Sequence, residues 1–286
     1  MHVMIFGCGY SGTAIAKAFL AEGFRVSGTT RSVDKAAALE EHGIVPHVFD
    51  GETLDEALLA DMKSATHLVQ SIAPRDSDPL LRLAGDDITK LMPDLRWIGY
   101  LSTVGVYGDH KGRWIDEETP CDPVSGRSKE RLEAEEGWIE TGKRLGIPAA
   151  VLRLSGIYGP GRNAFCNLER GTARRLIKKD QVFNRIRVED IGSATRFLAD
   201  RGIGGIHNVT DDLPAPPQDI IVEAARLMGV NPPPEQPFET AELTPMARTF
   251  YGENKRVSNA KLKAAGFVFA HPNYHVSLAQ LVHNYR

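Results

Sequence analysis

The chain has 286 residues, of which 42% are hydrophobic and 25% are charged. Lys and Arg number 34 against 37 Asp and Glu, so the formal net charge at pH 7 is −3. This composition is typical of a soluble globular protein and excludes collagen, a coiled coil and intrinsic disorder as descriptions of the whole chain. Because the charges nearly balance, nothing attracts the chain as a whole to nucleic acid or to a membrane surface. We therefore expect a small-molecule partner, held by local groups.

Cysteine and histidine show no arrangement typical of a cross-link or a metal site. Cys8, Cys121 and Cys166 are an odd number without CxxC spacing, which argues against a disulfide framework. The histidines are scattered without ligand spacing, so we predict no metal. No run approaches the ~18 apolar residues of a membrane span, and the amino terminus has no basic leader. We expect a cytoplasmic protein that is neither exported nor anchored.

The first 160 residues alternate short apolar runs with segments of helical periodicity. The apolar runs predict strands at residues 3–6, 24–28, 45–49, 67–72, 97–101 and 149–154. They show little alternation of apolar and polar residues, which indicates strands that are covered on both faces. The pattern predicts an α/β fold, a doubly wound parallel sheet of the Rossmann type.

The character of the sequence changes after residue 158. A Gly-Pro-Gly sequence at 159–161 interrupts the chain, a basic stretch follows at 162–179, and prolines gather at 213–237. A late strand at 205–209 and helical patterns at 220–228 and 259–265 complete the chain. We predict a dinucleotide-binding domain at 1–158, rejoined by 186–210, and a small substrate-binding cap at 159–185 and 211–286.

The sequence GCGYSG at residues 7–12 is a GxGxxG motif between a predicted strand and an amphipathic helix. The first glycine of such a motif permits a tight turn, the second lets the backbone approach a pyrophosphate, and the third allows close helix packing. A glycine-rich turn without a ligand is the alternative. We expect a dinucleotide to bind here, at Gly7, Gly9, Tyr10, Ser11 and Gly12.

The residues after the second predicted strand favour NADP as the cofactor, with NAD as the alternative. An NAD enzyme usually places Asp or Glu there, whereas this chain has Thr30, Arg31 and Ser32, which suit a 2′-phosphate. Arg31 could instead be a solvated charge and Ser32 a helix cap. Asp50, after the third strand, is placed either to contact the adenine amino group or to cap a turn.

Several segments in this order resemble the extended short-chain dehydrogenase/reductase family, the NAD-dependent epimerase/dehydratase group. They are LSTVGVYGD at 101–109, RLSGIYGPG at 153–161, SK at 128–129, RVEDI at 187–191 and HNV at 207–209. The likeness spans nearly the whole chain. It implies an oxidoreductase that transfers a hydride to or from a carbonyl or sugar carbon, as an epimerase, dehydratase or reductase.

In that family a Ser or Thr, a Tyr and a Lys carry out the chemistry, with the last two spaced YxxxK. Thr103 matches the hydroxyl residue and Lys129 matches the Lys, but Ser125 stands where the family has Tyr. An aliphatic hydroxyl is far less acidic than a phenol, so serine cannot simply replace it. Tyr158 or Tyr107 could supply the missing phenol, a different reaction could be run, or the protein could bind NADP(H) as a sensor without turnover.

Basic residues of the second half are candidates for the substrate side. The resemblance implies a nucleotide-sugar or a similar anionic substrate, and guanidinium groups suit a diphosphate or a carboxylate. Besides Arg162, the basic stretch holds Arg170, Arg174, Arg175, Lys178 and Lys179. The alternative to a ligand-binding role for these residues is a solvated helix face. Our substrate-binding candidates are Arg162, Arg185 and Arg187. The related proteins also suggest a homodimer through helices near 87–92 and 127–145.

Overall fold

The computed structural model describes residues 1–286, apart from the side chains of residues 245–247 and 249. The chain divides into two compact units. The first consists of Met1–Val106, Pro123–Leu154 and Ile191–His207, and the second of Tyr107–Asp122, Ser155–Asp190 and Asn208–Arg286. The second unit therefore includes Tyr107–Asp122, which the sequence analysis placed in the first domain.

A seven-stranded parallel sheet forms the centre of the first unit, with the strand order β11-β7-β5-β4-β1-β2-β3. Its strands are β1 (His2–Phe6), β2 (Arg25–Thr30), β3 (Val45–Val48), β4 (His67–Gln70), β5 (Trp97–Thr103), β7 (Ala149–Leu154) and β11 (Gly205–Val209). The predicted doubly wound α/β fold is confirmed. The last two strands have the predicted bounds, and the others differ by a few residues at their ends.

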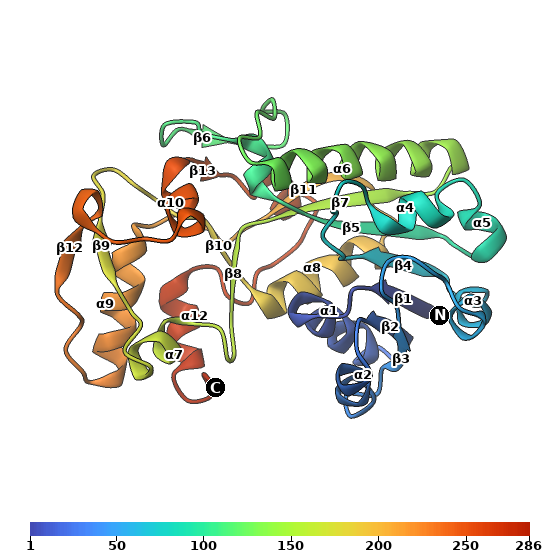
Figure 1. Ribbon diagram of the computed structural model, residues 1–286, viewed down its shortest axis with the longest axis horizontal. Coiled ribbons are helices and arrows are strands. Elements are labelled where there is room, and N and C mark those ends of the chain that lie inside the picture. Colours follow the sequence, from blue (N-terminus) through green and yellow to red (C-terminus); the bar gives the residue numbers. More distant parts are fainter. The chain divides into compact units, whose positions relative to one another are not determined.

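Helices cover both faces of this sheet. They are α1 (Tyr10–Leu20), α2 (Val33–Glu40), α3 (Glu56–Met62), α4 (Pro79–Ala84), α5 (Ile88–Leu91), α6 (Gly126–Leu145) and α8 (Val188–Asp200), with the 3₁₀ helix η1 (Val104–Tyr107) after β5. Figure 1 shows α1, α2 and α8 on one face and α4, α5 and α6 on the other. Because both faces are covered, every residue of β1 is buried, which explains its uninterrupted apolar sequence.

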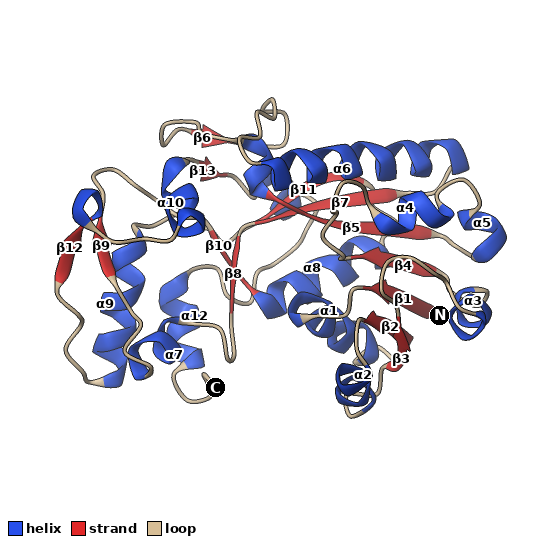
Figure 2. Cartoon of the chain, in the orientation of Figure 1, coloured by secondary structure: helices blue, strands red, loops and turns tan.

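The second unit is built from helices and very short strand pairs (Figure 2). Its helices are α7 (Ala164–Glu169), α9 (Pro217–Met228), η2 (Phe238–Thr240), α10 (Pro245–Gly252), α11 (Ala260–Ala264) and α12 (Tyr274–Leu281). Its strands are β6 (Trp114–Ile115), β8 (Gly156–Tyr158), β9 (Arg175–Ile177), β10 (Arg185–Arg187), β12 (Glu235–Pro237) and β13 (Arg256–Val257). They form the parallel pairs β8·β10, β9·β12 and β6·β13.

Three helices of the second unit share one apolar core. Phe165 of α7, Ile220 of α9 and Leu278 of α12 belong to a single cluster of buried residues. These helices lie beside the β8·β10 pair, so residues from both line a common pocket described below. Burial of this apolar surface stabilises an arrangement that strands of two or three residues could not maintain alone.

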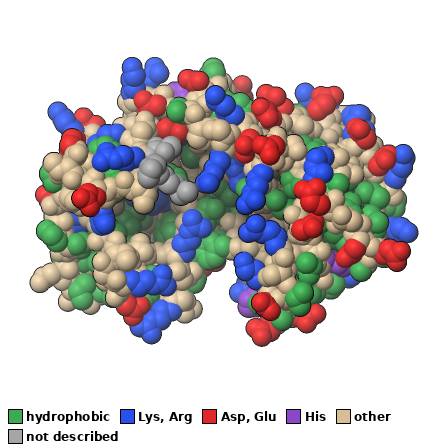
Figure 3. Space-filling view, in the orientation of Figure 1, with side chains coloured by type: hydrophobic (Ala, Val, Ile, Leu, Met, Phe, Trp, Pro, Cys, Tyr) green, Lys and Arg blue, Asp and Glu red, His purple; other side chains and the backbone are tan. Residues whose placement is uncertain are grey.

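Charged side chains of both signs are mixed over the face shown in Figure 3, as expected from the net charge of −3. In the part of the chain that the structure describes, no helix combines the length and the apolar character needed to cross a bilayer.

Candidate functional site

The three glycines of the GxGxxG motif occupy different environments between β1 and α1. Gly7 has φ +85°, and a Cβ there would lie 2.9 Å from the backbone nitrogen of Ile72. A Cβ at Gly12 would lie 2.8 Å from the Gly7 carbonyl oxygen. A Cβ at Gly9, in contrast, would meet no described atom within 4 Å. The protein's own packing therefore requires Gly7 and Gly12, whereas the space beside Gly9 is open to a ligand.

The motif is held in place by the end of β2. The Gly7 N–H donates to Thr29 Oγ1 at 2.8 Å, and the Cys8 N–H donates to the Thr29 carbonyl at 2.7 Å. The Cys8 side chain is buried, and this burial raises the pKa of its thiol to about 11. Cys8 is therefore a packing residue and not a reactive thiolate.

The first turn of α1 is arranged to receive an anion. Gly9 is its N-cap, no described side chain caps the helix, and no acidic residue lies in the first turn. Tyr10 and Ser11, the first two helical residues, are both partly accessible. Backbone N–H groups and the positive end of a helix dipole favour a phosphate at such a position.

The loop after β2 presents Arg31 and Ser32 in accessible positions. Arg31 is exposed and forms no ion pair with any described residue. Ser32 is the N-cap of α2, but its side chain makes no capping hydrogen bond with the described residues, whereas Thr30 is buried. Asp50 is exposed and accepts a hydrogen bond from the Glu52 N–H at 2.8 Å, so it caps a turn.

Thr103 lies at the carboxyl end of β5, facing the start of α6. Its Oγ1 accepts a hydrogen bond from the Gly105 N–H at 3.1 Å. A Cβ at Gly105 would lie 3.4 Å from Thr103 Oγ1 and 3.0 Å from Ser128 Oγ, so Gly105 lets these two hydroxyls approach each other. Ser128 was named above only as part of the SK segment and not as a site residue, because its proximity to Gly105 and Thr103 arises from the fold.

Ser125 has a structural role at the position where the family has tyrosine. It is the N-cap of α6: its Oγ accepts from the Ser128 N–H at 3.1 Å and donates to Ser128 Oγ at 2.9 Å. Lys129, in the first turn of the same helix, is exposed and forms no ion pair with the described residues. The ammonium of Lys129 is thus available to a ligand, while the Ser125 hydroxyl caps a helix.

A buried network joins α6 to the strands that carry these residues. Arg153 of β7 donates to both carboxylate oxygens of Glu135, with Nη2 2.7 Å from Oε2, and Ser102 donates to the same carboxylate. All three residues are at most 3% exposed. Because Ser102 precedes Thr103, the network fixes Thr103 relative to the helix that carries Ser125 and Lys129.

The two tyrosines considered as replacement phenols are both buried by packing. Tyr107 is fully buried, and its hydroxyl donates to Asn208 Oδ1 at 2.8 Å. Tyr158 lies in strand β8, and its Oη is buried. Burial raises the pKa of the Tyr158 phenol above its ordinary value, an effect larger than the opposing one of the neighbouring Ser277 hydroxyl. The Tyr158 phenol is therefore not tuned toward proton exchange at neutral pH.

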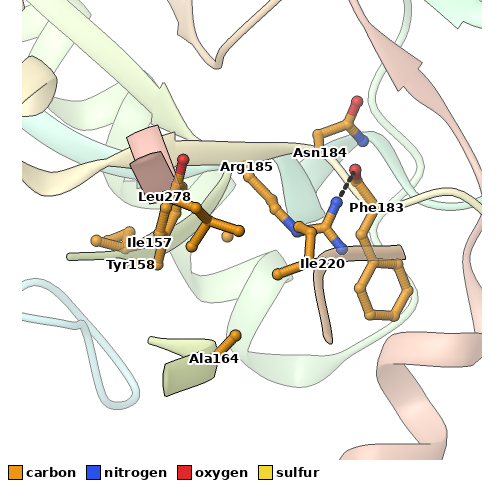
Figure 4. Close-up of a pocket in the computed structure, with 9 residues that line it drawn as sticks. Ile157, Tyr158, Ala164, Phe183, Asn184, Arg185, Ile220 and Leu278 are labelled. Carbon is orange, nitrogen blue, oxygen red and sulfur yellow. Dashed lines mark hydrogen bonds between the residues drawn. The ribbon is translucent and has the colours of Figure 1, made fainter. Parts of the chain in front are cut away.

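A pocket of about 220 Å³ lies within the second unit (Figure 4). Its lining comes from β8, α7, β10, α9 and α12: Gly156, Ile157, Tyr158, Ala164, Phe183, Asn184, Arg185, Ile220 and Leu278. Arg185 is the cation among these residues. A second, more open hollow shares some of these walls and is lined by Arg162, Asn167 and Arg170.

Other basic candidates of the second unit take part in internal contacts. Arg187 is 5% exposed; it donates to both carboxylate oxygens of Glu189 and to Ser277, and it lines neither hollow. Arg175 donates to Glu235 at 2.8 Å, and it lies in strand β9 and not in the helical stretch that we expected. Arg185 and Arg162 are therefore better placed to reach a ligand than Arg187.

Asp211, which the sequence analysis did not consider, lies close to Arg185. Its N–H donates to the Arg185 carbonyl at 2.7 Å, and its side chain is 1% exposed. Burial raises the pKa of the Asp211 carboxyl to about 7. Within the described residues there is no group of three or more His, Cys, Asp or Glu that could hold a metal ion.

Comparison with known proteins identifies two clear relatives. Protein YeeZ of Escherichia coli is 30% identical over 244 residues, which cover 81% of this chain and 85% of YeeZ. The structure of a functionally unknown conserved protein from Silicibacter pomeroyi is 42% identical, covers 98% of this chain and 97% of its own, and superposes with a TM-score of 0.88. No family model matches the chain.

More distant structures share the fold and bind nicotinamide cofactors. The dTDP-glucose 4,6-dehydratase of Bacillus anthracis, in complex with NAD, is 18% identical over 100% of this chain and 96% of its own, with a TM-score of 0.77. The human epimerase family protein SDR39U1, with NADPH, is 16% identical over 99% of this chain and 100% of its own, with a TM-score of 0.73. The chain therefore belongs to the same family as protein YeeZ, and its fold is that of the NAD(P)-dependent epimerases and dehydratases.

Proposed function

We propose that this protein binds NADP(H) at the carboxyl ends of β1 and β2 and transfers a hydride to or from a carbonyl or sugar carbon. The observation that carries the proposal is the open space at Gly9, between two glycines that the protein's packing itself requires. The N–H groups at the start of α1 would hold the pyrophosphate there. The likeness to enzymes that bind NAD or NADPH supports the same assignment.

The preference for NADP over NAD rests on Arg31 and Ser32. An exposed guanidinium without an ion pair among the described residues, beside a hydroxyl without a capping bond, suits a 2′-phosphate. The acid that would accept from a ribose hydroxyl is absent from the end of β2. Asp50 already caps a turn, so its second oxygen is the group left for the adenine.

The chemical step depends on Thr103 and Lys129. When bound, the cofactor supplies or accepts the hydride. The Thr103 hydroxyl would donate to the substrate oxygen on which negative charge develops, and the Lys129 ammonium would stabilise the same charge and orient the cofactor's ribose. Reduction of a carbonyl also takes up a proton, and the reverse oxidation releases one; because Ser125 caps α6, water would supply or accept this proton. The substrate class that we propose is anionic, because Arg185 and Arg162 line the hollows of the second unit.

Calorimetric titration of NADPH and NADH into the full chain tests the cofactor site. Gly9 has φ −90°, so Gly9→Ala should fold normally but bind NADPH at least about tenfold more weakly, because the new methyl group occupies the pyrophosphate's place. Gly252→Ala is the matched control, because Gly252 also has open space around its Cβ position. Equal NADPH affinity of Gly9→Ala and the wild type would contradict the proposal.

The hydride step is tested with 4-deuterated NADPH and a panel of carbonyl compounds and nucleotide sugars. We expect deuterium in at least one product, and we expect Lys129→Met to abolish the transfer, whereas Lys143→Met, at the far end of the same helix, should not.

A second candidate function is a nicotinamide-binding sensor without turnover. The use of the Ser125 hydroxyl as a helix cap favours it, because the group that usually moves the proton is replaced by one that stabilises the fold. Saturable NADPH binding without deuterium transfer to any compound of the panel would select this candidate over the enzyme.

A further inference from the structure

The guanidinium of Arg185 is held on one side and unpaired on the other. Its Nη1 donates to the Phe183 carbonyl at 3.0 Å and to the Ala215 carbonyl at 3.1 Å, which uses both hydrogens of this nitrogen. Its Nε and Nη2 form no hydrogen bond or ion pair with any described residue. The unused edge therefore offers parallel N–H donors, the arrangement that binds both oxygens of one carboxylate.

This cation lacks a paired anion among the described residues. Burial lowers the pKa of the Arg185 guanidinium to about 10, so it still carries its charge at neutral pH. Asp211 is the acid that acts on this guanidinium most strongly, and Asp219 is a further acid. Neither carboxylate has an oxygen within 4.0 Å of an Arg185 nitrogen, the limit for an ion pair. Arg185 is half-buried, and a charge that is partly removed from water is stabilised by a partner of opposite sign, so this edge of Arg185 is suited to an incoming anion.

The walls around Arg185 are apolar. Figure 4 shows Ile157, Tyr158, Ile220 and Leu278 around the space into which Arg185 extends. Two polar side chains lie among these walls. The Tyr158 hydroxyl is buried, and the amide of Asn184 is used internally: it donates to the Lys255 carbonyl at 2.9 Å and accepts from the Val257 N–H at 2.8 Å. The pocket thus combines one charged edge with a largely apolar lining.

The size and charge of the pocket select the class of ligand. A cavity of about 220 Å³ lies below the range of about 300–1,000 Å³ that is typical of pockets for drug-sized ligands, so it favours a small ligand. A diphosphate would bring two or more negative charges to one guanidinium in apolar surroundings, whereas a monocarboxylate brings one. We propose that this pocket binds a small monocarboxylate, whose oxygens accept from Nε and Nη2 of Arg185 and whose apolar tail lies against Ile157, Ile220 and Leu278.

This site does not depend on the proposed cofactor site. Every residue that forms it belongs to the second unit, so it can be tested whether or not NADPH binds. If the hydride-transfer proposal also holds, the monocarboxylate class narrows the anionic substrate to a small acid and makes a nucleotide sugar a poor fit to this pocket.

The test is calorimetric titration of the full chain at pH 6.5 with isovalerate, its neutral isostere isovaleramide, and inorganic phosphate. We expect saturable binding of isovalerate and at least about tenfold weaker binding of the amide and of phosphate. Arg185→Lys keeps the charge but removes the fork, so it should weaken isovalerate binding at least about tenfold. Arg174→Lys is the matched control, because Arg174 is exposed and donates to the Glu242 carbonyl outside the pocket.

A second variant tests the same pocket without changing its charge. Ala164 lines the pocket and is 6% exposed, so Ala164→Val narrows the cavity while keeping an apolar wall. It should weaken isovalerate binding more than acetate binding, because the longer tail needs the lost space. Thermal unfolding of each variant verifies that it is folded.

Three results would overturn the proposal: equal affinity for the acid and the amide, tighter binding of phosphate than of every carboxylate, or unchanged isovalerate binding in both Arg185→Lys and Ala164→Val. Titration of NADPH into the same preparations separates failure of this proposal from failure of the cofactor proposal. Wild-type NADPH affinity with no carboxylate binding would overturn the former alone.

Discussion

Two regions of this protein, the sheet with α6 in the first unit and the Arg185 pocket in the second, treat buried charge differently. In the first, the carboxylate of Glu135 is matched by Arg153 and Ser102, and Asp78 accepts from Gln70 and Trp138. In the second, Arg185 is half-buried and Asp211 is buried, yet no ion pair forms between them. Paired buried charges fix a scaffold, whereas a buried charge with an unused edge indicates a place for a ligand.

The groups that we propose to contact ligands also differ between the two units in their exposure to solvent. In the first unit, the proposed cofactor contacts are open backbone at Gly9 and exposed side chains at Arg31 and Lys129. In the second unit, the proposed ligand contact is a half-buried side chain in a small, largely apolar pocket. We therefore expect changes in the first unit's scaffold to affect stability most, and changes at the accessible groups to affect affinity.

Removal of one partner from the Glu135–Arg153 pair should produce the largest effect. Glu135→Ala leaves the Arg153 guanidinium buried without a counter-charge, so we expect the unfolding free energy to fall by about 3–5 kcal/mol. Urea denaturation measures the change, with Glu136→Ala, an exposed neighbour on the same helix, as the control. A loss for Glu135→Ala as small as that of the control would mean that the network does not hold α6 in place.

Reversal of the charge at Arg31 should change cofactor preference without a loss of stability. A charge-assisted contact with a 2′-phosphate contributes about 1.5–3 kcal/mol, so Arg31→Glu should lower the NADPH/NADH affinity ratio by about 10- to 100-fold. Arg96→Glu is the control. Arg96 lies just before β5, at the amino ends of the parallel strands, whereas Arg31 lies at their carboxyl ends. An unchanged ratio in Arg31→Glu would refute the phosphate assignment.

Two buried groups, one in each unit, should make stability respond to pH in opposite directions. Burial lowers the pKa of His2 to about 4, so its contribution to stability is present above pH 6.5 and is lost as the pH falls toward 4. Burial raises the pKa of Asp211 to about 7, so the folded state binds a proton more tightly, and stability falls as the pH rises from about 4 to 7.

Unfolding measured between pH 5 and 7 can isolate the contribution of Asp211. Each pH unit changes the free energy of unfolding by at most about 1.4 kcal/mol per group. Asp211→Asn should remove this part of the dependence, and Asp212→Asn, its partly exposed neighbour, should leave most of it in place. The same slope in Asp211→Asn and the wild type would contradict the assignment.

The smallest of these effects should come from the α6 cap. Ser125→Ala removes the acceptor for the Ser128 N–H, and loss of an N-cap costs about 1 kcal/mol. Thermal or urea unfolding measures the loss, and Ser125→Asp, which keeps a capping oxygen, should restore most of the stability. If Ser125→Ala instead leaves stability unchanged and abolishes hydride transfer, then Ser125 acts in catalysis.

The sheet of the first unit could be predicted because its strands carry local signals. Ala149–Leu154 and Gly205–Val209 have the predicted bounds, since covered parallel strands are apolar along their whole length. The short pairs of the second unit have no such signal. Trp114 pairs with Arg256 through strands of two residues, and only the distant partner defines them. The placement of Tyr107–Asp122 in the second unit was missed for the same reason.

Site residues divide in the same way. The turn at Gly7 and the helix start at Gly12 follow from residue type and spacing, because only glycine fits there. Ser128 and Asp211 could not be found, because their importance arises from neighbours brought together by folding and not by sequence. Arg187 shows the opposite error: its residue type suggests a ligand, but Glu189 and Ser277 occupy its donors.

The two carbonyl groups that hold Nη1 of Arg185 have a further consequence. A long side chain usually loses rotamer freedom when it grips a ligand, at a cost of about 0.5–1.5 kcal/mol. Because Phe183 and Ala215 immobilise this guanidinium in the free protein, that ordering is completed during folding. The receptor is preorganised, so a weakly interacting small acid can be retained by a single fork of donors.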